Sequence, residues 1–134
     1  MTEAEWKQVD KALRSVFSTG AKLRIDGYEV SLILRQVSQF SNAIVVYING
    51  EFRGKWLVED CEERRRFFQC KQKSVFSEKD AKKFGIRSKK RISELKNEYT
   101  YNAYSSVWKS FKKMKKHFID NNQQIELIKV YNPE

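Results

Sequence analysis

Cations and aromatic rings gather in one short stretch of the chain, EERRRFFQCKQK, residues 62–73. Arginine and lysine neutralise phosphates and release their counterions, and exposed aromatic rings stack on unpaired bases. Phe67 and Phe68 have an alternative role, because large aromatic side chains are usually buried in a core. We expect both rings to be buried and the surrounding cations to face an acidic partner, namely Arg64, Arg65, Arg66, Lys71 and Lys73.

The positive charge of the chain is concentrated around this stretch. The chain has 27 Lys and Arg against 17 Asp and Glu, a net charge of +10. Residues 64–91 hold twelve cations and two acids, which equals the whole surplus of +10. Such an asymmetry is typical of contact with phosphates or with an acidic protein surface. If two short helices fold beside the stretch, the patch also includes Lys82, Lys83, Arg87, Lys89, Lys90 and Arg91.

A second candidate surface is one side of a helix predicted over about residues 103–121. Apolar residues recur there at three- and four-residue steps, from Tyr104 through Val107 and Trp108 to Phe118. The opposite side could follow a nucleic-acid backbone, or it could be the ordinary solvent face of an amphipathic helix. This lysine strip consists of Lys109, Lys112, Lys113 and Lys116.

Residues suited to catalysis or metal binding are sparse. The single histidine, His117, has no evident orienting partner, and we expect it to lie at the edge of the apolar stripe. Cys61 and Cys70 do not match zinc-ligand spacing and are expected to be free thiols. No motif for nucleophilic catalysis or phosphate cradling is present. We therefore predict no catalytic residue, no metal and no cofactor.

A metal-dependent nuclease is the most distant hypothesis. It requires two or more carboxylates that converge on a divalent ion. Glu94 and Lys96 match a Glu-x-Lys triplet, but without a clear carboxylate partner. The acids near the predicted sheet are Asp26, Glu29, Glu51, Glu59 and Asp60, and hairpin turns already explain Asp26 and Glu51.

The elements that position these residues begin with an N-terminal helix. Thr2 and Glu5 form a capping box, and an apolar face follows. Gly20 offers a stop signal at the end of this helix. The apolar face consists of Trp6, Val9, Leu13, Val16 and Phe17.

Four antiparallel strands are predicted next, over residues 21–25, 28–37, 43–48 and 51–58. Asp26-Gly27 and Asn49-Gly50 are typical of two-residue hairpin turns. A strand or irregular edge is expected around residues 67–71, and short helices are expected over 77–85 and 88–96. Tyr99, Tyr101 and Tyr104 fit either a core or an interface. Residues 124–131 close the chain as a strand.

The predicted fold class is α+β, in one domain spanning residues 1–134. It consists of an N-terminal helix, a four-stranded antiparallel meander, two or three C-terminal helices and a short final strand. No apolar run approaches the roughly 20 residues that span a bilayer, and the N-terminus is amphipathic and carries acids, which is not typical of a signal or transit peptide. We expect a cytoplasmic protein with no membrane partner.

Several segments together resemble small basic proteins from phages and prophages of Gram-positive bacteria. These segments are YINGEFRGKWL (47–57), EERRRFF (62–68), SVWKSFKKMKKHF (106–118) and IELIKV (125–130). The resemblance covers most of residues 44–130. It implies a phage or prophage origin and a bacterial cytoplasm as the place of action, and it implies no reaction.

Charge and composition leave three hypotheses. The first is a non-enzymatic basic module that contacts nucleic-acid phosphates through residues 64–91, helped by the lysine strip. Contacts to bases are not expected to dominate, since no helix-turn-helix signature is present. The second is an accessory or inhibitory protein that binds an acidic host or phage protein, and the third is the nuclease. The sequence does not predict an oligomeric state.

Overall fold

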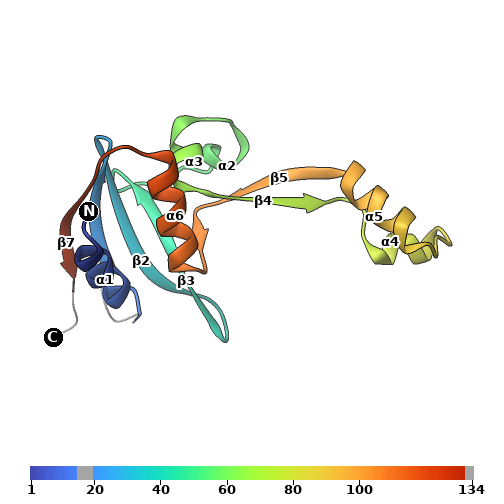
Figure 1. Ribbon diagram of the computed structural model, residues 1–134, viewed down its shortest axis with the longest axis horizontal. Helices are drawn as coiled ribbons and strands as arrows, with labels where there is room; N and C mark the ends of the chain where they lie inside the picture. The colour runs from blue at the N-terminus through green and yellow to red at the C-terminus, as the bar shows by residue number, and fades with distance from the viewer. Residues whose placement is uncertain (15–19, 132–134) are drawn as a thin grey trace. The chain divides into compact units, whose positions relative to one another are not determined.

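The computed structural model describes residues 1–14 and 20–131. Its contacts divide the chain into two compact units, which are described separately. Unit 1 consists of Met1–Gln69 and Ser105–Glu134, and unit 2 consists of Cys70–Tyr104. The described residues form six helices and seven strands, most of which are labelled in Figure 1, so the α+β class is confirmed.

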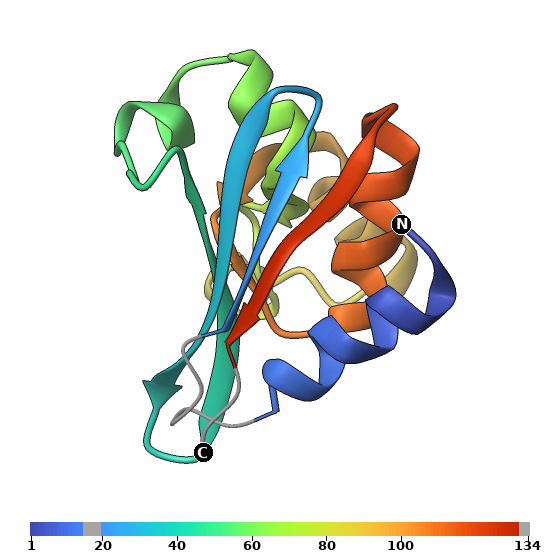
Figure 2. The ribbon, with the colours of Figure 1, turned by 90° about the vertical axis from the view of Figure 1, so that its left-hand side faces the viewer.

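Unit 1 is built on a five-stranded antiparallel sheet of order β6-β3-β2-β1-β7 (Figure 2). The first three strands form the predicted meander, and the predicted final strand is confirmed and pairs with β1. The strands are β1 (Gly20–Ile25), β2 (Tyr28–Ser38), β3 (Ser41–Ile48), β6 (Val107–Trp108) and β7 (Ile125–Tyr131).

Both predicted two-residue turns are present. Asp26 and Gly27 have φ angles of 45° and 87°, and Asn49 and Gly50 have φ angles of 53° and 75°. Positive φ at both central residues matches the right-handed twist of the strands that the turn joins. The first turn sets Asp26 at the end of two inner strands of the sheet, where it becomes part of the candidate site.

Alternate residues of the strands are buried on one face of this sheet. Leu32 pairs with Val46, and Val30 pairs with Ile48, and all four are fully or almost fully buried. Helix α1 (Glu3–Ala12) packs against β1 and β7, and α6 (Phe111–Asn121) contacts β6. The core of unit 1 therefore lies between the sheet and these helices.

The N-terminal helix is confirmed with its capping box, in which the Glu5 amide donates to Thr2 Oγ1 at 3.2 Å. The helix ends at Ala12, and Gly20 opens β1 rather than stopping the helix. The predicted contributions of Val16 and Phe17 lie outside the described residues.

The prediction of a fourth strand over residues 51–58 is wrong. Glu51 makes one bridge to Ile48, and Lys55–Val58 then forms the short helix α2. Trp56 is buried, and its ring centroid lies 6.0 Å from that of Phe68. This packing on Phe68 favours the helix over a continued strand. The place beside β3 is taken by β6.

The prediction of a helix from about residue 103 is also wrong in its first part. Helix α6 begins at Phe111 after the N-cap Ser110, and residues 100–108 form β5 (Thr100–Ser105) and β6. Trp108 leaves the helix because β6 pairs with β3 and its indole binds a distant carbonyl. The predicted edge around residues 67–71 lies at the junction of α3 (Glu62–Phe67) and β4 (Gln69–Ser74).

Unit 2 pairs two strands, β4 and β5, and carries two helices between them. Both helices were predicted and are confirmed: α4 (Glu78–Lys83) after the N-cap Ser77, and α5 (Lys89–Glu98) after the N-cap Ser88. Gly85 has a φ of 71°, the left-handed conformation that commonly follows the end of a helix. Unit 2 therefore joins two short cationic helices through the five-residue connection 84–88.

Candidate nucleic-acid interface

The stretch EERRRFF forms α3, and its two phenylalanines are fully buried as expected. The ring of Phe67 packs edge-on against Tyr28 and Phe118, with centroids 5.5 Å and 5.7 Å away. Phe68 packs with Trp56 and Phe52. Neither ring is exposed enough to stack on a base.

The end of α3 is capped by side chains from the C-terminal part of unit 1. The last carbonyls of a helix have no partner within the helix. The Trp108 indole donates to Phe67 O at 3.0 Å, and Asn122 Nδ2 donates to Arg66 O at 3.3 Å. His117 Nε2 lies 3.0 Å from Arg65 O, and since a carbonyl only accepts, this nitrogen carries the proton.

His117 is therefore a capping residue. Burial lowers the pKa of its imidazole, with a smaller opposite effect from its bond to Arg65 O. Its ring packs against that of Trp108 at a centroid distance of 5.2 Å. The prediction that His117 lies at the edge of the apolar stripe agrees with this half-buried position.

Arg66 is held by an internal network rather than presented to a partner. Its guanidinium donates to Asp26 Oδ2 at 2.7 Å, to Asn122 Oδ1 at 2.9 Å and to Glu62 Oε1 at 2.6 Å. Its side chain is only 24% exposed. The network joins three separate segments of unit 1, the β1–β2 turn, α3 and the α6–β7 connection.

Asp26 is the centre of this network. The backbone amides of Gln123 and Gln124 each donate to its carboxylate at 2.8 Å. These two bonds are the main reason that the pKa of Asp26 is lowered, and Arg66 contributes further. A carboxylate with these partners fixes the connection into β7.

The other two arginines of α3 differ from Arg66 and from each other. Arg65 is exposed, and its nearest carboxylate is that of Asp60 at 3.6 Å. Arg64 is half-buried. The arginine triplet therefore presents one exposed cation, Arg65, where the sequence suggested three.

Replacing Arg66 by alanine is expected to lower the free energy of unfolding by about 2 kcal/mol, because charged hydrogen bonds to three side chains are lost. Arg65→Ala is the matched control and is expected to change it by less than about 0.5 kcal/mol. Urea unfolding followed by circular dichroism measures both. Equal effects of the two substitutions would contradict the internal role of Arg66.

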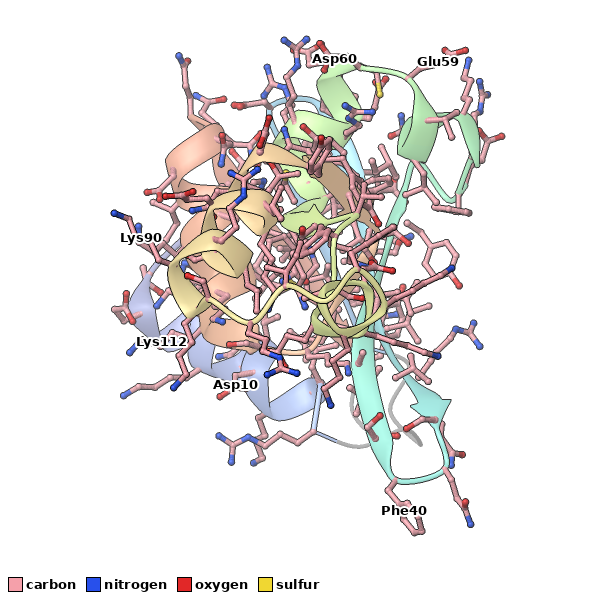
Figure 3. The ribbon with its side chains drawn as sticks, turned by 90° about the vertical axis from the view of Figure 1, so that its right-hand side faces the viewer. Asp10, Phe40, Glu59, Asp60, Lys90 and Lys112 are labelled. Atoms are coloured by element: carbon pink, nitrogen blue, oxygen red, sulfur yellow. The ribbon has the colours of Figure 1, made fainter. Side chains whose placement is uncertain are left out.

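The lysine strip is only partly on α6. Lys109 precedes the N-cap, and Lys112 and Lys113 are exposed in the first turn (Figure 3 labels Lys112). Lys116 pairs with Asp120 at 3.1 Å. The sequence did not single out a fifth lysine, Lys115. Its Nζ donates to Glu3 Oε2 at 2.9 Å and so links α6 to α1.

Unit 2 carries the densest exposed charge. Its 35 residues include ten Lys and Arg against four Asp and Glu, a net charge of +6. Arg91 pairs with Glu94, and Lys96 pairs with Glu78, each at 3.4 Å. Among described residues, no carboxylate forms a salt bridge with the remaining exposed cations, which are Lys71, Lys73, Lys79, Lys82, Lys83, Arg87, Lys89 and Lys90.

Several exposed lysines, on unit 2 and on unit 1, occupy positions that disfavour positive charge. The first turn of α5 holds Lys89 and Lys90 and no acid, and that of α6 holds Lys112 and Lys113 and no acid. The N-terminal end of a helix dipole is positive, so each such cation opposes helix stability by a few tenths of a kcal/mol. The side chains of Lys90 and Lys112 extend away from their helices (Figure 3).

An open apolar groove of about 600 Å³ also lies within unit 2. Phe84 and Val75 are each 70% exposed beside it, and Tyr99 is 53% exposed. The sequence did not single out this groove, although apolar residues scattered among so many charges were a usable signal. It is lined by Val75, Phe76, Asp80, Phe84, Ile86, Arg91, Leu95 and Tyr99.

The three tyrosines left open by the sequence have mixed positions. Tyr99 and Tyr101 are about half exposed, and Tyr104 is less exposed and lies in β5. Tyr99 caps the end of α5 and lines the groove. Tyr99 is therefore the tyrosine best placed to meet a ligand.

The acids considered for a nuclease have other partners or are dispersed. Glu29 pairs with Lys22 at 2.8 Å, and Glu51 pairs with Arg53 at 3.0 Å. Within residues 1–14 and 20–131, no group of three His, Cys, Asp or Glu side chains could hold a metal ion.

Cys61 and Cys70 are free thiols. None of the described helices is both long and apolar enough to cross a bilayer.

A scan against protein-family models, a search of curated proteins and a search of solved structures found no match to this chain. The resemblance to phage and prophage proteins therefore stays a prediction.

Proposed function

We propose that this protein is a basic module that binds nucleic acid through the exposed cations of unit 2. The observation that carries the proposal is the net charge of +6 on 35 residues, most of it on exposed side chains that form no salt bridge with a described carboxylate. Cations of this kind bind phosphates and release counterions, which favours association with a polyanion. No reaction is proposed.

Helix α3 contributes fewer cations to the proposed interface than the sequence suggested. Arg66 holds the fold, and Arg64 is half-buried, so neither is included in the proposed binding set. Arg65, Lys112 and Lys113 remain exposed on unit 1 and could add phosphate contacts. The proposed binding set on unit 2 is Lys71, Lys73, Lys82, Lys83, Arg87, Lys89 and Lys90.

A quadruple variant of Lys82, Lys83, Lys89 and Lys90 to glutamine tests the proposal. Each neutralised phosphate contact lowers the steepness of log Kd against log salt by about 0.7–0.9, so the slope is expected to become shallower by about 3. Fluorescence polarisation with labelled oligonucleotides, at about 50 to 200 mM salt, measures affinity and slope.

The matched control neutralises four exposed cations of unit 1 that lie outside the proposed set. This control variant replaces four residues by glutamine, namely Lys7, Lys11, Arg24 and Arg35. Each quadruple variant removes four charges from +10, so both have a net charge of +6. It is expected to keep most of the salt slope. Equal losses in the two variants would show a general charge effect, and no binding by the parent chain would move the proposal to an acidic protein partner.

A further inference from the structure

Unit 2 is too small to cover its own apolar residues. All of its residues are described, and the buried ones are Ala81 and Leu95. Phe84 lies between the two helices and is 70% exposed, although the burial of such a ring is usually favourable. An exposed apolar groove beside polar groups is typical of a binding surface.

The groove combines the two kinds of group that recognise an unpaired base. The rings of Phe84 and Tyr99 offer flat surfaces, and Arg91 also lines the groove. Bases stack on aromatic rings and on arginine planes in complexes with single strands. A paired base in a duplex is already stacked on its neighbours and cannot use such a surface.

Charge surrounds the ring on both sides along the chain. Lys82 and Lys83 precede Phe84 directly, and Arg87 and Lys89 follow it within five residues. All four are exposed. A base placed on Phe84 would therefore bring the phosphates on either side of it within reach of cations.

The size of the groove favours a nucleic acid over a folded protein partner. Stable protein interfaces use about 20–30 residues on each side. This groove is lined by eight residues, within a unit of 35 residues. A single strand requires less, because its affinity comes from phosphates along the backbone and from one or two stacked bases at each site.

We propose that this groove binds one or two unpaired bases of a single-stranded nucleic acid, stacked on Phe84 and Tyr99, while the neighbouring cations hold the phosphates. The inference rests on the proposed nucleic-acid function and adds to it a preference for single strands. It also assigns base stacking to rings other than the buried Phe67 and Phe68.

The test uses the full chain and three substitutions of the exposed ring, Phe84→Ala, Phe84→Leu and Phe84→Trp. The probes are a labelled oligodeoxythymidylate of about 12 nucleotides, an RNA strand and a duplex of the same length. Leucine keeps apolar contact without a flat π surface, and tryptophan keeps the surface. Phe40→Ala is the control, because this ring is 91% exposed on unit 1.

Phe84→Ala and Phe84→Leu are expected to raise Kd for a single strand about 5- to 100-fold and to leave the salt slope unchanged. Phe84→Trp and Phe40→Ala are expected to bind like the parent chain, and the duplex is expected to bind more weakly. Parent-like affinity of Phe84→Leu would overturn the stacking role, and equal affinity for duplex would overturn the single-strand preference. The lysine variants would still decide the proposed function separately.

Discussion

Replacement of Phe67 by alanine is expected to lower the free energy of unfolding by about 3–5 kcal/mol. Phe67 has no exposed surface and contacts Tyr28 and Phe118. These two neighbours lie on separate segments, β2 and α6, which cannot both move into the space that the ring leaves. The loss is a large share of the stability of a typical domain.

The control for this substitution is Phe40→Ala, which removes the same atoms from a ring that is 91% exposed. It is expected to change stability by less than about 0.5 kcal/mol. Guanidinium unfolding at constant protein concentration measures both variants. If Phe67→Ala unfolded at the same midpoint as Phe40→Ala, α3 would not be packed on the core as described.

Gly20→Ala is expected to destabilise the protein by about 3 kcal/mol or more, from backbone strain and from steric conflict together. Gly20 has a φ of 87°, and an added Cβ would collide with the carbonyl oxygen of Leu32. Leu32 is paired with Ala21 on one side and with Val46 on the other, so its backbone cannot move away.

Gly27→Ala separates these two contributions. Gly27 has the same φ of 87°, but nothing lies within 4 Å of an added Cβ. Its cost is expected to be about 1 kcal/mol, from strain alone. Thermal unfolding of both variants gives the comparison, and similar melting temperatures would mean that β1 and β2 do not approach as closely as the structure shows.

The elements that could be predicted from the sequence depend on neighbouring residues. Thr2 with Glu5, and Ser77 with Asp80, form their capping boxes within three residues. The Asp26-Gly27 turn needs only two residues in positive φ. Such signals are complete within a few positions of the chain, and they were therefore visible before the fold was known.

The elements that could not be predicted depend on distant contacts. Trp56 lies in the short helix α2, where it packs with Phe68. Trp108 lies in strand β6, where its indole donates a hydrogen bond to Phe67 O. The helical spacing of Val107 and Trp108 favoured the wrong element, because periodicity carries no information on those partners. Tertiary contacts of this kind override local preference.

The candidate site shows the same division. Its location in the basic segment could be predicted from charge alone, but Arg65 and Arg66 are indistinguishable by composition. They differ because Asp26 lies beside Arg66, 40 residues away along the chain. A partial signal existed, since Glu62 and Arg66 have the spacing of a helical ion pair.

The discontinuity of unit 1 has a consequence for biosynthesis. β1, β2 and β3 leave the ribosome first, and the strands that flank them, β6 and β7, follow only after the whole of unit 2. Until then both outer strands of the meander present unpaired backbone groups, and the end of α3 has no caps. The core of unit 1 therefore stays incomplete while the cationic unit 2 is synthesised. It can be completed only when Trp108, His117 and Asn122 have been synthesised and can cap α3.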